Sequence, residues 1–347
     1  MTTSPARFAT PEEIQNWNTH ILNNPDGGSV FASKEYADIK KLTAYTPRFV
    51  MASGIAITVL EKSTPPIGKF WYLPKGPGVT TSAQLLKVLE ALKPLAKKSR
   101  VFAIRVESEL PQANQASLKE AGLVPAKPVI PNPSTITLDV SPTLDDLLTS
   151  LPQKGRHAIR RAARDGVTIK RVPVTSENAQ IMYKLLAETA DGQFGIRSYN
   201  YYRKYWGTFE NAKLGQLFFA YYDGVVVAGA YAMAFGTKST YKDGASVRQR
   251  TAYGASHLLQ WEVITWSKEI GALVHDFCGS PPSDEIDNTE HPHYGIGRFK
   301  SSFSKNVIDY IGCYDLVVNA TSYTLWTKGL ERVHKSIYLR RTGDFYY

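Results

Sequence analysis

The sequence predicts an α/β protein made of two mixed α/β domains. Three observations lead to this prediction. The chain has 347 residues, which is long for a single hydrophobic core. Short strand-like apolar runs alternate with segments whose apolar residues recur at helical spacing. This alternation starts again after Pro152, so we expect the chain to divide near residue 150.

The first domain is expected over residues 1–150, completed by a C-terminal segment, residues 320–347, that returns to it. Helical spacing of apolar residues and an acidic or lysine-bearing end predict helices at residues 11–22, 34–42 and 82–97. Apolar and β-branched runs predict strands at residues 49–60, 70–73, 101–106 and 134–140.

The second domain, expected over residues 151–319, has the clearer order of elements. Two helices come first, at residues 181–189 and 199–209. Asp223-Gly224 then joins two strand-like runs, which is a strong hairpin signal. A third strand, an amphipathic helix at 256–270, a strand at 272–277 and an apolar segment at 307–318 follow. This order is that of an acetyltransferase-like (GNAT) domain, and the first half repeats it less clearly, so we expect two tandem GNAT-like domains.

Composition excludes several classes of protein. The net charge of +10 favours an anionic partner such as RNA, phosphate or an acidic membrane surface, although a generally basic surface is the alternative interpretation. The two cysteines, Cys278 and Cys313, form no C-x-x-C pair, which argues against a disulfide scaffold and a metal site. No signal-peptide core and no run of about eighteen apolar residues occurs, so we expect a cytoplasmic protein, at most peripheral to a membrane.

One loop argues against acetyl-CoA as the donor. GNAT enzymes hold the pyrophosphate with a loop of the form Arg/Gln-x-x-Gly-x-Gly/Ala before the long helix. Here the corresponding stretch is Thr251-Ala-Tyr-Gly254-Ala-Ser256, which departs at its first and last positions. We therefore expect a different acyl donor and no cofactor.

Eight segments of the chain carry a resemblance to one known family. They are Ser33-Lys-Glu-Tyr-Ala-Asp-Ile-Lys40, Tyr72-Leu-Pro-Lys-Gly-Pro77, Ile104-Arg-Val-Glu107, Lys154-Gly-Arg-His-Ala-Ile-Arg-Arg-Ala-Ala-Arg-Asp-Gly166, Phe194-Gly-Ile-Arg197 with Tyr201, His257-Leu-Leu-Gln-Trp-Glu262, His275-Asp-Phe-Cys-Gly279 and Phe299-Lys-Ser-Ser-Phe303. Taken in order, they resemble the FemABX family of peptidoglycan bridge-forming aminoacyltransferases. No long charged helical hairpin follows Gly166, so the chain resembles the compact members that lack the coiled-coil arm. Two positions depart from the family pattern: Glu107-Ser108 stands where Asp-Pro is usual, and Ser304-Lys305 where Gly-Gly is usual.

The resemblance implies an activity and its partners. The family moves an amino acid from aminoacyl-tRNA to the peptide-stem amine of a peptidoglycan precursor, either lipid II or UDP-MurNAc-pentapeptide, in forming cell-wall cross-bridges. The membrane surface, contacted peripherally, is a further possible partner. Two other interpretations stay open. In the first, the chemistry is the same but the acceptor is a small peptide or nucleoside metabolite. In the second, the chain is a non-catalytic GNAT-like protein that binds RNA.

Lys300 is the expected catalytic residue, because it matches the family's Phe-Lys motif. Positive charge aimed at the oxyanion formed during attack on an ester is usually the largest catalytic contribution. The alternative is an ordinary surface lysine whose stem lies on apolar neighbours and whose accessible ammonium adds little to stability. Glu107 is a candidate base for the attacking amine, and Asp276 is a second one.

Five further residues are expected to bind the precursor. Lys40 and Arg197 match the positions that hold the diphosphate in compact relatives, and Tyr201 lies four residues after Arg197, on the same side of the predicted helix. Tyr241, at a strand end, and Phe299, beside the catalytic lysine, complete the set. A solvated Lys40 and an ordinary half-buried Tyr241 are the alternatives.

A dense run of basic residues is the candidate tRNA-binding surface, since RNA backbone contact needs positive charge but no reading of bases. Its members are Lys154, Arg156, Arg160, Arg161 and Arg164. Helical spacing would place Arg156, Arg160 and Arg164 on one face, and a merely solvated face is the alternative. Residues 326–341 are also basic and amphipathic, which suits tRNA, an anionic membrane or packing against the first domain.

Overall fold

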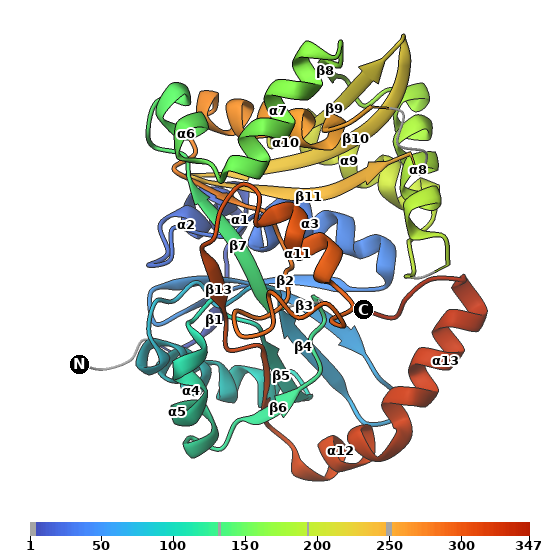
Figure 1. Cartoon of the computed structure of the whole chain (residues 1–347). Coiled ribbons are helices and arrows are strands. Elements are labelled where there is room, and N and C mark those ends of the chain that lie inside the picture. Colours follow the sequence, from blue (N-terminus) through green and yellow to red (C-terminus); the bar gives the residue numbers. More distant parts are fainter. Residues whose placement is uncertain (1–4, 131–132, 193, 248–251) are drawn as a thin grey trace. The chain divides into compact units, whose positions relative to one another are not determined.

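The computed structural model describes residues 5–130, 133–192, 194–247 and 252–347. The chain divides into two compact units: unit 1 comprises Met1–Pro133 with Asp309–Tyr347, and unit 2 comprises Ser134–Ile308 (Figure 1). Within the described residues, each unit contains a mixed seven-stranded sheet with helices beside it. The predicted α/β fold class is confirmed.

The observed division differs from the expected boundaries. Strand β7 (Ser134–Asp139) pairs with β12 (Val274–Asp276) in the second sheet, and Leu147 of α6 (Leu144–Ser150) is buried in the core of unit 2. Residues 134–150 therefore belong to unit 2, not to the first half. The return to unit 1 begins at Asp309 and not near residue 320, because β14 (Cys313–Val317) inserts into the first sheet.

The sheet of unit 1 has the order β1-β2-β3-β4-β5-β14-β6. Strands β4 and β5 are parallel, and β14 is antiparallel to both of its neighbours. The strands other than β14 are β1 (Arg7–Phe8), β2 (Thr46–Ala52), β3 (Ile55–Ser63), β4 (Lys69–Leu73), β5 (Val101–Val106) and β6 (Val124–Ala126).

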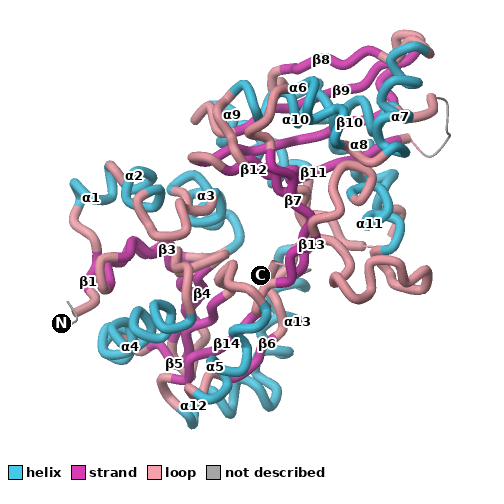
Figure 2. The backbone as a smooth tube through the Cα atoms, turned by 60° about the vertical axis from the view of Figure 1, so that its left-hand side comes forward, coloured by secondary structure: helices cyan, strands magenta, loops and turns pink. Residues whose placement is uncertain are grey.

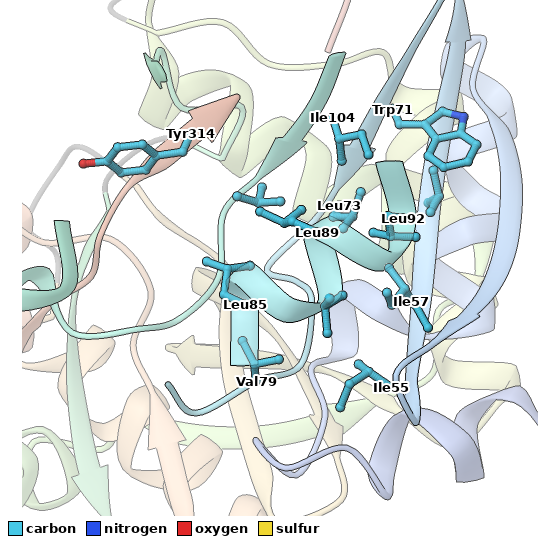
Figure 3. Close-up of a cluster of buried hydrophobic side chains, with 14 of the residues drawn as sticks. Ile55, Ile57, Trp71, Leu73, Val79, Leu85, Leu89, Leu92, Ile104 and Tyr314 are labelled. Atoms are coloured by element: carbon cyan, nitrogen blue, oxygen red, sulfur yellow. The ribbon is translucent and has the colours of Figure 1, made fainter. Parts of the chain in front are cut away.

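Helix α4 (Ser82–Lys98) forms the main core of unit 1 against this sheet. Thr81 caps its first turn by accepting a hydrogen bond from the backbone N–H of Gln84. Its leucines and valine at spacings of three and four residues are buried on one side, which is the signature of an amphipathic helix. Figure 3 shows Leu85, Leu89 and Leu92 pointing toward strand residues that include Ile57 and Leu73.

The remaining helices of unit 1 are shorter. The helix expected at residues 11–22 is interrupted at Asn16, which ends one helix and begins the next. The shorter helices of unit 1 are α1 (Pro11–Gln15), α2 (Trp17–Leu22), α3 (Lys34–Lys40), α5 (Gln115–Glu120), α12 (Ala320–Leu325) and α13 (Glu331–Thr342). A π-helical turn at Trp326–Leu330 joins α12 to α13.

The sheet of unit 2 has the order β13-β7-β12-β11-β10-β9-β8, and its strands lie side by side in Figure 2. The Asp223-Gly224 turn joins β9 (Gly215–Tyr222) to β10 (Val225–Phe235) as predicted, and both turn residues have positive φ. The other elements are β8 (Thr168–Val172), β11 (Lys238–Ser246), β13 (Val307–Asp309), α7 (Gln153–Arg164), α8 (Ser176–Ala190), α9 (Tyr199–Asn211), α10 (Ala255–Glu269) and α11 (Tyr294–Lys300).

Helices cover both faces of this sheet. Ala228 and Ala230 of β10 lie in one core with Leu259 of α10, whereas Gly229 between them lies against Met182 of α8. Because successive strand residues face opposite sides, α10 and α8 lie on opposite faces. Among the described residues, none of the helices is long and apolar enough to cross a membrane.

Candidate active site

Lys300 ends helix α11 with its ammonium group buried. Its Nζ donates hydrogen bonds to the backbone carbonyls of Cys278 and Gly279, the second at 2.6 Å. The residue is only 7% exposed, so the alternative of a surface lysine with an accessible ammonium was wrong. An ammonium has three N–H donors, and these two carbonyls take two of them. Among the described residues, no third group accepts a hydrogen bond from this ammonium.

The two carbonyls are presented by a turn where β12 ends. One carboxylate oxygen of Asp276 accepts hydrogen bonds from the backbone N–H of Cys278, at 2.7 Å, and from the hydroxyl of Thr135. Cys278 has a left-handed backbone with φ of 56°, which is uncommon for a non-glycine residue. Asp276 thus positions the turn, and the turn positions Lys300.

Burial changes the electrostatics of Lys300. Loss of solvent lowers its pKa to about 8, against the opposing influence of Cys278 and Asp276. The group is therefore mostly charged at neutral pH and loses its charge in mildly alkaline solution. A charge in a site of low dielectric constant acts more strongly on a nearby oxyanion than the same charge in water.

Aromatic rings surround the motif on the side of α10. The ring of His257 lies 5.0 Å from Phe299 and 5.6 Å from Phe303, measured between centroids. Burial, with a smaller effect of Lys154, lowers the pKa of His257 to about 4, so it is neutral at physiological pH. Its neutral ring supports the aromatic residues that flank Lys300.

The N-terminus of α7 lies directly against the same motif. A Cβ atom at Gly155 would collide with the carbonyl oxygen of Ser302, so only glycine permits this close approach. Lys154 is thereby placed near His257 and the Phe299 side of the motif.

Helix α7 also covers the start of α10, where an acetyl-CoA enzyme would hold its pyrophosphate. Gly254, which precedes α10, has φ of 77°, and a Cβ there would collide with the carbonyl oxygen of Ala158. Residue 251, the first position of the departing loop, lies outside the described residues.

A second group of polar residues in unit 2 surrounds Arg197. Its guanidinium carbon lies 4.9 Å from the ring centroid of Tyr201, so the two side chains are neighbours, but Arg197 precedes α9 and the two do not share a helix side as was expected. Ser198 caps α9 by accepting a hydrogen bond from the backbone N–H of Tyr201, which fixes where this helix begins.

Lys242 and Asp243 belong to the same neighbourhood, and sequence reasoning missed both. Lys242 is the extra residue of a β-bulge, because Tyr231 pairs with Asp243 and Ala232 with Tyr241. The Lys242 ammonium lies 3.0 Å from a carboxylate oxygen of Asp243, whose other oxygen accepts a hydrogen bond from the Trp206 indole.

The bulge brings this ion pair to α9. The pKa of Lys242, which burial alone would lower, is raised by the nearby negative charge of Asp243. Sequence reasoning could not find this ion pair, because its position depends on the bulge. The bulge in turn depends on how β10 and β11 pair, which the local sequence does not show.

Tyr241 lies just past the point where β11 and β12 stop pairing, at Thr240 and Asp276. Its ring covers Gly244, because a Cβ there would collide with the Tyr241 hydroxyl. The side chain is half-buried against the core on the α10 side, and burial raises its pKa. This environment fits the alternative of an ordinary half-buried tyrosine as well as a binding role.

In unit 1, Glu107 lines a small, partly open pocket together with Lys75, Ser108 and Tyr310. It is 6% exposed, and burial raises the pKa of its carboxyl group. Hydrogen bonds from the Tyr72 hydroxyl and the Val129 backbone N–H, the latter at 2.6 Å, oppose this shift.

Lys40 is also in unit 1, at the end of α3, and it is buried rather than solvated. It is 6% exposed, and its ammonium lies 5.2 Å from the ring centroid of Tyr36 and 5.9 Å from that of Tyr45. Lys75, in a matched family segment but without a predicted role, lies 3.7 Å from Glu109 and 5.2 Å from the Tyr310 ring.

The basic residues of α7 do not form the single stripe that was expected. Arg156 is partly buried and donates to the carbonyl oxygens of Thr149 and Leu151, so it stabilises the end of α6. Arg161 pairs with Asp165 at 3.2 Å and lies over the Tyr253 ring. Arg164 also pairs with Asp165, at 3.7 Å, and its side chain is exposed like those of Lys154 and Arg160.

The structure brings Lys300, Phe299 and Lys154 together in unit 2 and places Arg197 with Tyr201 in the same unit. Glu107 and Lys40 belong to unit 1. The predicted site residues thus form separate groups, each built from elements distant in sequence.

Comparison with known structures defines the class of fold. The crystal structure of FemX has a TM-score of 0.79, with 18% sequence identity, over 94% of this chain and 100% of FemX. A tandem GNAT protein from the clavulanic acid biosynthesis pathway has a TM-score of 0.50, with 12% identity, over 92% of this chain and 99% of that protein. The fold is therefore that of two tandem GNAT-like domains, as predicted.

Sequence comparison identifies the family. The sequence profile of the FemAB family matches residues 130–223 and 212–328, more than half of the chain, and the chain belongs to this family. Lipid II:glycine glycyltransferases of Staphylococcus aureus and Staphylococcus epidermidis are each 22% identical to it over 93% of this chain. The matches span 96% and 95% of those relatives. The resemblance stated from the motifs and the prediction of a transferase enzyme are confirmed.

Proposed function

We propose that the protein transfers an amino acid from aminoacyl-tRNA to the peptide-stem amine of a peptidoglycan precursor, lipid II or UDP-MurNAc-pentapeptide, in cell-wall cross-bridge formation. The observation that carries this proposal is the buried ammonium of Lys300, held by two carbonyls with a third N–H left over. The relatives named lipid II:glycine glycyltransferases support the acceptor class. The cytoplasm, where aminoacyl-tRNA is made, is the proposed site of the reaction.

The reaction is aminolysis of an ester. The acceptor nitrogen attacks the carbonyl carbon of the aminoacyl group, a C–N bond forms, and negative charge collects on the carbonyl oxygen. The bond to the terminal ribose oxygen then breaks, that oxygen takes up a proton, and the nitrogen loses one. Lys300 donates to the oxyanion, an interaction stronger in the transition state than with the neutral ester.

Glu107 is the proposed acceptor of the amine proton. Burial raises the pKa of its carboxyl group, which makes it a better base than a solvated carboxylate. Asp276, the other candidate, holds through Cys278 the turn that positions Lys300, so we assign it a positioning role.

Substrate binding is assigned to the remaining groups. Lys40 and Arg197 bind the diphosphate of the precursor, and the three aromatic candidates, Tyr201, Tyr241 and Phe299, line its path. The exposed residues of α7 bind tRNA phosphates: Lys154, Arg160 and Arg164. Arg156 and Arg161 support this helix through their contacts within the protein.

The test is a transfer assay with purified protein, a mixture of charged tRNAs and muropeptide precursors, read by mass spectrometry. The expected result is a precursor heavier by one amino-acid residue, and loss of that product with Lys300→Met. Mass gain only on a small peptide or nucleoside would assign the acceptor to that class instead. No gain on any acceptor, with tRNA bound, would overturn the enzymatic proposal.

A further inference from the structure

The chain leaves the sheet of unit 1 after β14 and continues through α12 and α13, which lie at the edge of that unit (Figure 1). The inner side of this segment is firmly attached. Trp326 is fully buried, with its ring 6.2 Å from Phe70 and 5.6 Å from Phe102. His334 lies against Trp326 at 5.5 Å, and Tyr338 lies 5.7 Å from the Tyr346 ring. Helix α13 is therefore held in a fixed orientation on unit 1.

The outer side of α13 carries apolar side chains that this attachment does not use. Val333 is 50% exposed, Ile337 44% and Leu339 52%. Single exposed apolar residues are normal in soluble proteins. Val333 and Ile337 lie on successive turns of one side of this helix, whose inner side is already occupied by His334 and Tyr338, and together they indicate a surface that a partner covers.

Basic residues lie among these apolar ones. Val333, Ile337 and Arg340 are spaced four and three residues apart and form one row along the helix, with Arg332 and Arg341 beside it. In the part of the chain that the structure describes, none of Arg332, Arg340 and Arg341 has an ion-pair partner within 4.0 Å. Lys335 differs, because it pairs with Glu331 at 2.8 Å. Residues 320–347 contain five basic and two acidic side chains.

We propose that this outer face of α13 docks on the surface of an anionic lipid bilayer. The face is defined by Arg332, Val333, Ile337, Arg340 and Arg341. A mixed apolar and positive helix side is suited to the boundary between lipid headgroups and acyl chains, where valine and isoleucine lose water and arginines meet lipid phosphates.

The chemistry of this face distinguishes a membrane from RNA. RNA phosphates would pair with the arginines but would leave the exposed Val333 and Ile337 without a contact. Arginine is also enriched at protein interfaces, so an acidic protein partner is the outcome that an absence of vesicle binding would indicate. Docking would hold the enzyme where a lipid-linked acceptor is embedded, and this consequence rests on the function proposed above.

The experiment is vesicle sedimentation with the full chain. One set of vesicles is pure phosphatidylcholine and the other contains 30% phosphatidylglycerol. Wild-type protein is expected to sediment with the anionic vesicles only, and added salt should weaken binding because surface charges are screened. Val333→Asp with Ile337→Asp should reduce the partition coefficient about tenfold or more, since two apolar contacts become repulsive.

A second variant tests charge alone. Arg340→Ala with Arg341→Ala should reduce binding roughly five-fold for each arginine removed, the effect of one basic residue near an anionic surface. Val225→Asp is the matched control, because Val225 is 63% exposed but belongs to unit 2. It should bind as wild type does. Thermal unfolding of each variant confirms that the fold is retained.

Binding to neither vesicle, or equal binding by wild type and both α13 variants, would overturn the proposal. Loss of tRNA binding in the arginine variant without any vesicle binding would also overturn it, in favour of an RNA surface. Vesicle binding requires neither donor nor acceptor, so its outcome is independent of the transfer assay. Transfer to water-soluble UDP-MurNAc-pentapeptide should be unchanged in both α13 variants, whereas transfer to lipid II in vesicles should fall with binding.

Discussion

Replacing Lys300 by methionine tests the central feature of the site, a charged group held out of solvent. The pKa of Lys300 is lowered by burial from its ordinary 10.5 to about 8. Between these pH values the unfolded chain binds a proton that the folded chain does not. Stability must therefore rise as pH increases through this window, and it is lowest where Lys300 is charged in both states. A difference of about 2.5 pH units corresponds to about 3 kcal/mol.

Denaturant unfolding of wild type and Lys300→Met at pH 7 and pH 10 measures this contribution. Methionine keeps most of the stem but cannot titrate. The stability of wild type relative to the variant should increase by roughly 2.5 kcal/mol between the two pH values. Other titrating groups are common to both proteins and cancel. Lys305→Met, an exposed lysine in the same segment, controls for loss of a lysine as such. A difference that does not change with pH would refute the buried ammonium.

The same variant tests catalysis. Removing one donor to an oxyanion typically lowers kcat by a factor of about 100 to 1,000, and we expect Lys300→Met to fall within this range. Lys300→Arg should recover only part of the rate, because a planar guanidinium places its charge differently. In wild type, the rate should decline as pH rises above about 8, where Lys300 loses its charge. Near-normal turnover of a folded Lys300→Met protein would refute its role.

The order of elements in unit 2 was predictable because its signals are local. The hairpin follows from Asp223-Gly224 between two apolar runs, and α10 follows from apolar spacing. The position of the division was not predictable. Strand β7 is the first strand of unit 2, but its partner β12 lies more than 130 residues later. Pairing across such a distance leaves no mark in a local pattern.

The motif was enough to select Lys300 as the catalytic candidate, but it did not predict that the side chain is buried. The carbonyl clamp depends on the left-handed backbone of Cys278, and cysteine gives no signal for that conformation. The same reasoning applies to Arg156. Helical spacing grouped it with Arg160, yet its guanidinium is occupied by carbonyls of the preceding helix. Spacing predicts which residues share a face, but it cannot predict what a neighbouring element offers them.

The remaining predictions concern binding and stability. Lys40→Ala and Arg197→Ala should raise KM for the precursor more than they lower kcat, because contacts remote from the ester act in ground and transition states alike. Steady-state kinetics measures both constants, and an unchanged KM would show that the substituted residue does not bind the precursor. The basic residues of α7 assigned to tRNA are Lys154, Arg160 and Arg164, all of them exposed. Replacing all three by alanine should weaken tRNA binding and reduce the slope of log binding constant against log salt concentration by about one per lost contact. An unchanged slope would show that this helix face is only solvated. Asp315→Asn should destabilise unit 1 by about 3–5 kcal/mol in denaturant unfolding, because it leaves the guanidinium of Arg105 buried without its charge partner. Two hydrogen bonds of 2.8 Å join these side chains across β5 and β14, and both are nearly inaccessible. Replacing the pair together, Arg105→Met with Asp315→Leu, should cost less than Asp315→Asn alone, since no uncompensated charge remains. A double variant that is less stable than the single one would show that packing around the pair, and not its charge, holds β14 in the sheet.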